Sequence, residues 1–346
     1  MPANHRPRIL SGMRPTGKLH LGNLVGALEN WVKLQDQYDS YHFVADWHML
    51  TTEYANVEGL QENILEMVTD WLAAGLDPNK STFFVQSRLP EHAELHLLFS
   101  MFTPLGWLER VPTYKEQLEN IKDRDLHTYG FLGYPVLQAA DILMYKAEAV
   151  PVGEDQVPHV ELTREIARRF NHHYGLVFPE PQALLTNAPR LPGTDGRKMS
   201  KSYGNPIYLS DPADVVSKKV AGMMTDPARK RRTDPGNPDV CPVFDFHKIF
   251  SPGDVIERVN RECRTAEIGC VECKKLMAVS LNGFLDPIRD RRKPLEENHQ
   301  RVWDILDAGT ERARAVAQST MAEVREAMNL IHETGKAPAK ELQDAR

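Results

Sequence analysis

Short apolar runs alternate with longer stretches of helical periodicity over the first 155 residues. The runs 8–11, 41–45, 82–85 and 149–152 have the length and composition of buried strands, and Gly12 and Gly153 are expected to end the first and the last. Between them, apolar side chains recur at helical spacing within 24–34, 57–72 and 137–145. Strands that alternate with helices predict a parallel sheet with right-handed crossovers, the doubly wound, Rossmann-like α/β class.

The pattern changes after about residue 205. Connections rich in proline and glycine appear around 234–238, and from Val302 to Met328 the apolar positions keep a helical period. We therefore expect a Rossmann-like catalytic domain over 1–205 and a smaller all-α domain over 206–335. The last helices of the second domain are expected to pack back on the first, and 336–346 is expected to be a polar tail.

Composition places the chain among ordinary globular proteins. Of 346 residues, 41% are hydrophobic and 26% are charged, and the formal net charge is −6. No apolar run reaches the roughly 18 residues that span a bilayer, and the first residues are polar, so we expect a cytoplasmic protein without a membrane segment. Because the net charge is negative, nucleic acid would have to bind local basic patches, for which the runs 229–232 and 289–293 are candidates. A solvated surface explains such runs equally well.

The segment His20–Asn23 (His-Leu-Gly-Asn) follows the first predicted strand and opens the first predicted helix. The first turn of a helix offers unpaired N–H groups and the positive end of its dipole, which suit a phosphate. His20 can donate to phosphate oxygens, Gly22 lets a flat ring such as adenine lie against the backbone, and Asn23 can cap the helix or contact the nucleotide. A capped helix with an incidental histidine explains this segment as well.

The segment Lys198–Ser202 (Lys-Met-Ser-Lys-Ser) lies in a polar, turn-rich stretch. Two lysines three positions apart on a loop can close over a triphosphate and stabilise the charge on departing pyrophosphate. Taken alone, the segment is equally typical of a solvated loop. Together and in this order, the two segments indicate attack of a carboxylate on the α-phosphate of ATP.

This pair resembles the HIGH and KMSKS elements of the class I aminoacyl-tRNA synthetases. The resemblance narrows through three further segments: 46–48 (Asp-Trp-His), 134–141 (Tyr-Pro-Val-Leu-Gln-Ala-Ala-Asp) and 153–164, which begins Gly-Glu-Asp-Gln and ends Glu-Leu-Thr-Arg. With the C-terminal stretches around 286–309, this set is similar to the tryptophanyl-tRNA synthetase family from about residue 8 to residue 330.

The resemblance implies an enzyme that activates L-tryptophan with ATP to tryptophanyl-adenylate and pyrophosphate, and then transfers tryptophan to the 3′-terminal ribose of tRNA(Trp). It also implies Mg²⁺ bound with ATP, an anticodon-binding role for 206–335, and a homodimer. The carboxylate of tryptophan is already a nucleophile at pH 7. The reaction therefore needs positioning and charge stabilisation, and no side-chain base.

The same resemblance assigns functional residues. Catalytic roles are expected for His20, Asn23, Lys198, Lys201 and Ser202. ATP binding is expected to use Asn23, Lys198, Lys201 and Ser202 as well. Further residues are expected to bind ATP without a catalytic role: Arg14, Pro15, Thr16, Gly22, Lys115, Gly153, Glu154, Asp155, Leu191, Met199 and Ser200. Tryptophan binding is expected at His48, Tyr134, Gln138, Asp141 and Gln156. The chain departs from the family at Arg14, where Gln is usual, and at Gln138, where many members have Met.

Asp141 is the residue expected to select the amino acid. An indole has one polar atom, an N–H donor, and a buried carboxylate can accept its hydrogen bond. A substrate without that donor leaves the carboxylate unpaired, which costs orders of magnitude in specificity. Gln138 lies three residues earlier on the same helix face, so both side chains can reach one pocket. A structural helix aspartate is the simpler alternative.

All four cysteines lie within 33 residues, at Cys241, Cys263, Cys270 and Cys273. Four thiolates, two of them in a Cys-x-x-Cys pair, can hold a [4Fe–4S] cluster or tetrahedral zinc. The spacing resembles that of a cluster-binding subset of tryptophanyl-tRNA synthetases, with one residue fewer in the first gap. We expect a [4Fe–4S] cluster with a structural or tRNA-facing role, while zinc and free thiols remain alternatives.

Two other functions stay open on the sequence alone. Tyr134, Gln138 and Asp141 also resemble the tyrosyl branch of the family, although the residues of the run 153–164 argue against it. A non-catalytic paralogue that binds tRNA or tryptophan is the other alternative, and intact His20 and Lys201 argue against that.

Overall fold

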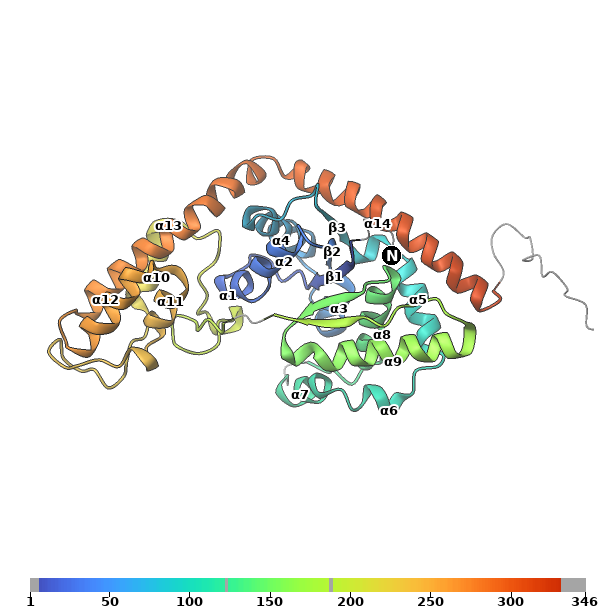
Figure 1. Ribbon diagram of the computed structural model, residues 1–346, viewed down its shortest axis with the longest axis horizontal. Coiled ribbons are helices and arrows are strands. Elements are labelled where there is room, and N and C mark those ends of the chain that lie inside the picture. The colour runs from blue at the N-terminus through green and yellow to red at the C-terminus, as the bar shows by residue number, and fades with distance from the viewer. Residues whose placement is uncertain (1–5, 122–123, 187–188, 331–346) are drawn as a thin grey trace, which may run out of the picture.

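The structure is a computed structural model that describes residues 6–121, 124–186 and 189–330. At its centre is one parallel sheet with the strand order β3-β2-β1-β4-β5 (Figure 1). The strands are β1 (Arg8–Met13), β2 (Asp39–Val44), β3 (Ser81–Val85), β4 (Ala149–Val152) and β5 (Gln182–Leu185). The chain winds outward from β1 to β3 and then from β4 to β5, so the predicted doubly wound α/β class is confirmed.

Helices connect the strands. After β1, helix α1 (Leu21–Asn23), a π-helical turn η1 (Leu24–Leu28) and α2 (Glu29–Leu34) form one continuous helical segment. Helices α3 (Asp46–Glu53) and α4 (Leu60–Ala74) follow β2, while η3 (Glu154–Gln156) and α9 (Val157–Tyr174) follow β4. Between β3 and β4 lie η2 (Gln86–Arg88), α5 (Glu91–Ser100), α6 (Leu105–Leu108), α7 (Pro112–Asn120) and α8 (Tyr129–Met144).

Both faces of the sheet are apolar, because successive strand residues point to opposite sides and helices cover each side. Val44 and Phe83 belong to a core shared with α2 and α4. Phe43 and Phe84 belong to a second core shared with α5, α8 and α9. The sheet is therefore buried on both sides, and its strand ends are left to form a ligand site.

Two expected element boundaries are wrong. Strand β1 continues through Gly12 to Met13. Gly12 is needed there because a Cβ would lie 2.4 Å from Cε1 of the Phe43 ring on the neighbouring strand. Helix α4 begins at Leu60, so exposed Val57 lies before it.

The helical part follows β5 and includes η4 (Lys201–Tyr203), α10 (Ala213–Gly222), η5 (Pro238–Val240), α11 (Pro242–Phe250) and α12 (Gly253–Arg264). Two long helices, α13 (Cys270–Glu296) and α14 (His299–Ala327), then lead from this part back over the sheet. Figure 1 shows them as an arch, with α10 to α12 under its left end and the sheet under its right half. No helix in the described ranges is long and apolar enough to cross a membrane.

Helix α14 covers the edge of the sheet at β3. Gly309 makes the approach possible, since a Cβ there would lie 1.8 Å from the carbonyl oxygen of Phe83. An uncovered edge strand would present unpaired backbone groups to solvent and to other chains. The C-terminal helix is thus part of the α/β core as well as an extension of the helical part.

Candidate active site

A cavity of about 460 Å³ lies at the carboxyl end of the sheet, where β1 and β4 are neighbours. The strand order reverses direction here, and open α/β sheets bind ligands at such a switch point. Apolar side chains in its wall include Trp31, Phe43, Phe131, Ile142 and Val150. The structure also brings all five residues predicted for tryptophan to this cavity: His48, Tyr134, Gln138, Asp141 and Gln156.

Asp141 of α8 lines the cavity although it has no exposed surface. Its Oδ2 accepts a hydrogen bond from His48 Nε2 (2.6 Å), and its Oδ1 accepts from Gln86 Nε2 (2.8 Å) and His92 Nδ1 (2.7 Å). Burial alone would raise the pKa of this carboxyl, but the rings of His48 and His92 hold the pKa below its ordinary value. A carboxylate accepts about four hydrogen bonds, so a position on Oδ2 is left for one more donor.

A buried network fixes the protons around this carboxylate. Because an ionised carboxylate can only accept, His92 must donate from Nδ1. Its Nε2 lies 2.8 Å from the Tyr145 hydroxyl, and burial raises the pKa of Tyr145 well above its ordinary value. Asp141 therefore stays ionised beside the cavity and is held in one orientation.

Tyr134 lies on the same helix, next to a second histidine. Its hydroxyl is 2.8 Å from Thr113 Oγ1 and 3.0 Å from Nε2 of His159, and all three residues line the cavity. Burial lowers the pKa of His159 to about 4, so this ring is neutral at pH 7. Neutral groups that donate and accept hydrogen bonds at this wall suit a polar but uncharged part of a ligand.

The two segments that are predicted to bind the nucleotide meet in space. The Leu21 N–H donates to Ile207 O (3.0 Å), and His20 pairs with Tyr208 in an antiparallel bridge. Lys201 Nζ donates to the backbone oxygen of Thr16 (2.5 Å). Burial, and then the charge of Lys201, lower the pKa of His20 to about 4. At pH 7 the two segments therefore bring together a neutral imidazole and a lysine.

The Lys198–Ser202 loop is held by Asn205, a buried residue that the sequence analysis missed. Asn205 Oδ1 accepts the Ser200 N–H (2.8 Å), and its Nδ2 donates to Lys198 O (3.1 Å) and to Asp195 Oδ1 (2.7 Å). The side chain of Met199 is buried beside Gly22, whereas Lys198 and Ser202 are exposed. The loop is an ordered turn in which Lys198 and Ser202 are exposed and Lys201 reaches Thr16.

Some residues predicted for ATP lie at the cavity. Arg14 lines it and donates to the hydroxyl of Thr52, and its buried Nε has no partner among the described residues. Burial lowers the pKa of Arg14. Gly153, at the end of β4, lines the same cavity. Pro15 and Thr16 lie in the turn between Arg14 and His20, where Thr16 contacts Lys201.

Other residues predicted for ATP lie elsewhere. Lys115 is exposed on α7, whose Thr113 and Gln117 face the cavity instead. Glu154 and Asp155 are exposed on η3 and do not line the cavity. Leu191 is buried in the core that includes Met199. In this structure these four side chains do not meet the cavity.

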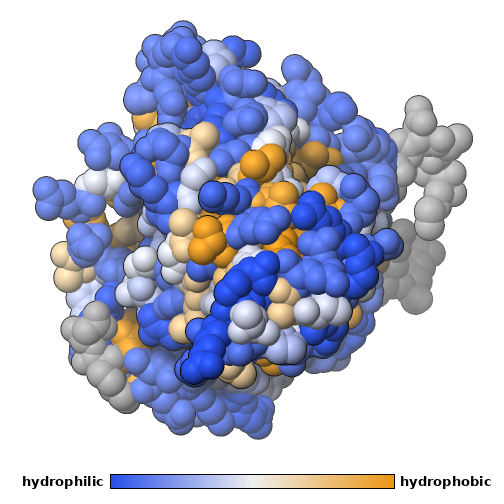
Figure 2. Space-filling model, turned by 90° about the vertical axis from the view of Figure 1, so that its left-hand side faces the viewer, coloured by the Kyte–Doolittle hydropathy of each residue, from blue (hydrophilic) through white to orange (hydrophobic). Residues whose placement is uncertain are grey.

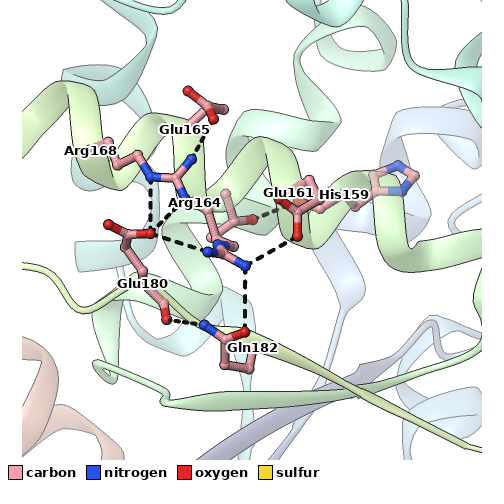
Figure 3. Close-up of polar contacts among 8 residues, drawn as sticks. His159, Glu161, Arg164, Glu165, Arg168, Glu180 and Gln182 are labelled. Carbon is pink, nitrogen blue, oxygen red and sulfur yellow. Dashed lines mark hydrogen bonds and ion pairs between the residues drawn. The ribbon is translucent and has the colours of Figure 1, made fainter.

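In the second half of the run 153–164, His159 and Arg164 lie in different surroundings. His159 lines the cavity, while Arg164 donates to Glu161, Glu180 and Gln182 on the outside of the sheet. Figure 3 shows the His159 ring directed away from this cluster, which also contains Arg168. Arg164 therefore ties α9 to β5 and the segment before it.

Among the residues that sequence reasoning missed, only Gln86 has a weak sequence signal. Gln86 comes directly after β3, where the strand-end rule predicts ligand contacts. His92 and Thr113 lie on helices α5 and α7, which no apolar pattern indicated. Their contribution depends on the long connection between β3 and β4, so only the folded chain reveals it.

The four cysteines are free thiols at the ends of α11, α12 and α13. Burial raises the pKa of Cys273 to about 12, and the other three thiols, which lie near it, add to the rise. Among the described residues, no three His, Cys, Asp or Glu side chains are placed to hold one metal ion. The sulfurs are therefore neighbours, but they are not gathered around one ion-sized point.

Figure 2 views the molecule from the end formed by the helical part. Hydrophobic side chains gather in the middle of a largely hydrophilic face. Large apolar residues exposed in this part of the chain include Met224, Val240, Val271 and Val279. Val271 lies in the first turn of α13, between Cys270 and Cys273.

The two basic runs are largely engaged within the fold. Arg229 donates to Ile268 O (2.8 Å), and Arg232 donates to Glu267 O (2.6 Å). Arg291 donates to Ala73 O (2.6 Å), and Arg292 is 2% exposed. The expectation that the run 289–293 forms a phosphate-binding surface is wrong for Arg292, because its guanidinium is buried among carboxylates of α4 and α13.

The fold and the site together define a class. A parallel sheet has its cavity at the switch point, a helix start with a neutral histidine lies nearby, and a lysine-bearing loop closes on the same turn. These are the parts of a nucleotide-dependent ligase of the class I synthetase type.

Comparison with known proteins agrees. The family model for class I tRNA synthetases (W and Y) matches residues 1–286, and the chain belongs to this family. It is 57% identical over 329 residues to the tryptophan–tRNA ligase of Thermotoga maritima. The alignment covers 94% of this chain and 99% of that protein. The corresponding Aquifex aeolicus protein is 47% identical over 393 residues, with coverage of 93% and 100%.

Solved structures give the same assignment. The tryptophanyl-tRNA synthetase of Campylobacter jejuni, complexed with ADP and tryptophan, aligns with a TM-score of 0.84 and 33% identity over 93% of this chain and 100% of that one. A tyrosyl-tRNA synthetase from Archaeoglobus fulgidus aligns with a TM-score of 0.64 and 23% identity over 84% of this chain and 91% of that one. The second likeness shows a common fold.

Proposed function

We propose that this enzyme joins L-tryptophan to tRNA(Trp), through tryptophanyl-adenylate and with release of pyrophosphate from ATP. The observation that carries this function is Asp141: a buried, ionised carboxylate at an apolar cavity, with one acceptor position left. The indole N–H is the donor that completes it. Curated relatives that match nearly the whole chain are tryptophan–tRNA ligases, which supports the same substrate.

The proposed first step needs no side-chain base. The carboxylate of tryptophan attacks the α-phosphorus of ATP, and the bond from that phosphorus to the bridging oxygen of pyrophosphate breaks. Neutral His20 can donate a hydrogen bond to a phosphate oxygen, and Lys198 and Lys201 balance the charge that develops on pyrophosphate. Mg²⁺ enters bound to ATP as part of the substrate. Asn23 accepts the His20 N–H (3.1 Å) and keeps the start of the helix in place.

We assign Arg14 to the anionic centre of this reaction. Its guanidinium lines the cavity, and its unpartnered Nε is a donor held for a ligand. The carboxylate of tryptophan or the α-phosphate is the anion expected there. Gly153 and Gln156 complete the wall next to it, whereas Lys115, Glu154 and Asp155 would need a movement of α7 or η3 to reach the nucleotide.

Tryptophan-dependent exchange of pyrophosphate into ATP tests the function directly. Exchange with tryptophan and not with tyrosine is the expected result, followed by aminoacylation of tRNA(Trp). Exchange with tyrosine alone would identify a tyrosyl enzyme. The absence of exchange with either amino acid would indicate the non-catalytic paralogue.

The helical part is proposed to bind the anticodon of tRNA(Trp), and its four cysteines are proposed to hold a [4Fe–4S] cluster. The donor set is four thiols in one region, which suits a cluster, and a cluster offers a separate iron to each thiolate. Zinc would need the four sulfurs around one ion, which the described side chains do not provide. When bound, the cluster would supply a rigid link between α11, α12 and α13.

Metal analysis of protein purified without oxygen tests that proposal. About four irons and four sulfides per chain, with absorbance near 400 nm, are expected, and the Cys270→Ser variant should lose them. One zinc per chain, or no metal, would overturn the cluster assignment.

A homodimer in the cytoplasm is proposed as the working form. Exposed apolar side chains support an interface on α5 and its surroundings: Leu97 (52% exposed), Met101 (67%), Leu105 (63%) and Tyr129 (68%). Leu97 and Met101 share one helix face, and Tyr129 packs against neighbouring His96. Sedimentation of the natural chain and of the Met101→Lys variant tests this interface. We expect the natural chain to form a dimer and the new charge to weaken that dimer. If both proteins sediment as monomers, the homodimer is refuted.

A further inference from the structure

One buried ion pair connects helix α13, through Asp70 of α4, to the segment that contains His20. Asp70 of α4 has no exposed surface, and its Oδ1 pairs with the guanidinium of Arg292 on α13. Its other oxygen, Oδ2, accepts the backbone N–H of Leu19 at 2.7 Å. Leu19 is buried and directly precedes His20. The carboxylate of Asp70 thus contacts both helix α13 and Leu19, the residue before His20.

The geometry points to a positioning role: we propose that Asp70, held by Arg292, fixes the Leu19 amide and thereby sets the position of His20 for ATP. This inference rests on the proposed function. It makes the placement of α13 over α4 a condition of a correctly formed ATP site.

The segment around His20 is held from two sides. On one side, Leu19 O accepts the Leu209 N–H (3.0 Å) and Leu21 N–H donates to Ile207 O (3.0 Å), which ties it to the strand-like stretch after the lysine loop. On the other side, the Leu19 N–H reaches Asp70. Without Asp70 a buried amide would lose its acceptor, and the segment would be held from one side only.

Arg292 is needed because Asp70 is buried. A lone carboxylate at this depth is strongly disfavoured unless a cation pairs with it. Arg292 also pairs with Glu66 of α4 and with Glu296 of its own helix, so its guanidinium forms ion pairs with three carboxylates. Burial raises the pKa of Asp70 to about 6, and the charge of Arg292 opposes that rise.

The charge of Asp70 also reaches the lysine loop. Burial lowers the pKa of Lys201, and the nearby carboxylate of Asp70 opposes that change. The ammonium of Lys201 is held 2.5 Å from Thr16 O, in the turn that leads to Leu19. Both nucleotide segments therefore depend on one buried carboxylate.

The test uses a double variant that avoids an orphan charge, Asp70→Leu with Arg292→Met. A buried ion pair can be replaced by apolar residues without loss of stability, so this variant is expected to fold, with a melting temperature lowered only by the unpaired Leu19 amide. Its kcat/KM for ATP in pyrophosphate exchange is expected to fall at least tenfold, while KM for tryptophan stays within twofold, since Asp141 lies in a different network. Hydrogen exchange in the peptide 19–24 is expected to become faster.

Arg325→Met is the matched control. Arg325 also ties a long C-terminal helix to the α/β part, but it does so through Glu94 of α5, which is not part of the histidine segment. Its loss is expected to change the melting temperature and to leave KM for ATP and the exchange of peptide 19–24 unchanged. If the double variant keeps natural exchange in that peptide and a natural KM for ATP, the pair serves stability alone and the positioning role is refuted. The hydrogen-exchange result needs no activity, so it stands even if the natural chain shows no pyrophosphate exchange.

Discussion

Replacement of Asp141 by asparagine is the sharpest test of amino-acid selection. The carboxylate accepts from His48, Gln86 and His92, and one acceptor position is left for the substrate. An asparagine keeps the shape but has one oxygen, which the donors Gln86 and His92 will hold. The NH₂ group of the asparagine then takes the place of Oδ2, the oxygen that was left for the indole N–H. An NH₂ group is a donor, so it cannot accept that hydrogen bond.

The magnitude follows from that lost bond. A hydrogen bond to a charged group contributes about 1.5–3 kcal/mol, and about 1.4 kcal/mol corresponds to a tenfold change. We therefore expect kcat/KM for tryptophan to fall by roughly 10- to 100-fold, with KM for ATP little changed.

The assay compares tryptophan with its benzothiophene analogue, which lacks the N–H donor, in pyrophosphate exchange. The natural enzyme should prefer tryptophan strongly, and Asp141→Asn should lose most of that preference. Gln138→Met is the control, because Gln138 lines the same cavity, while the hydrogen bonds described for Asp141 come from His48, Gln86 and His92. If Asp141→Asn keeps the natural preference at an unchanged melting temperature, then Asp141 does not read the indole and the reasoning fails.

Three further predictions concern catalysis, packing and pH. Lys201→Ala should lower kcat of activation much more than it raises KM for tryptophan in pyrophosphate exchange, because its charge acts on departing pyrophosphate; equal effects on both would contradict this. Gly309→Ala should lower the free energy of unfolding by about 3 kcal/mol or more, since a Cβ there would lie 1.8 Å from Phe83 O. Gly283→Ala is the control, because Gly283 has open space around it, and this change should be neutral or stabilising by up to about 1 kcal/mol. Denaturant titration compares the two variants. The melting temperature should fall from pH 7 to pH 5, because three buried rings with lowered pKa values, near 4, 3 and 4, must take up protons on unfolding: His20, His42 and His159. Asp70, with its pKa raised to about 6, acts in the opposite direction over roughly the same window, and a melting temperature that rises toward pH 5 would show that it outweighs the histidines.

Regular patterns carried most of the fold prediction. The strands β1 to β4 appear in the sequence as short apolar runs, and the helical period after residue 302 marks α14 correctly. The prediction missed β5, whose residues are partly exposed and have little apolar pattern, and it missed α3 and α5 to α7. Helix α5 is an example: polar Glu91 and His92 are buried whereas apolar Leu97 is exposed, so its apolar residues do not mark the buried face.

The sequence alone was sufficient for the class of reaction, because the histidine and lysine segments are short, local and chemically specific. It also predicted five residues that the structure brings to one cavity, since strand ends and one face of a helix are local features: His48, Tyr134, Gln138, Asp141 and Gln156. Their role in tryptophan binding stays a prediction. Tertiary structure alone decided the network of Gln86, His92 and Tyr145 around Asp141, and the burial of Arg292 against Asp70. A basic run appears as a surface feature in the sequence, and only packing decides which of its charges are removed from water. The physical reason is that burial and pairing depend on residues that are far apart in the chain, 55 positions for Gln86 and Asp141 and 222 positions for Asp70 and Arg292.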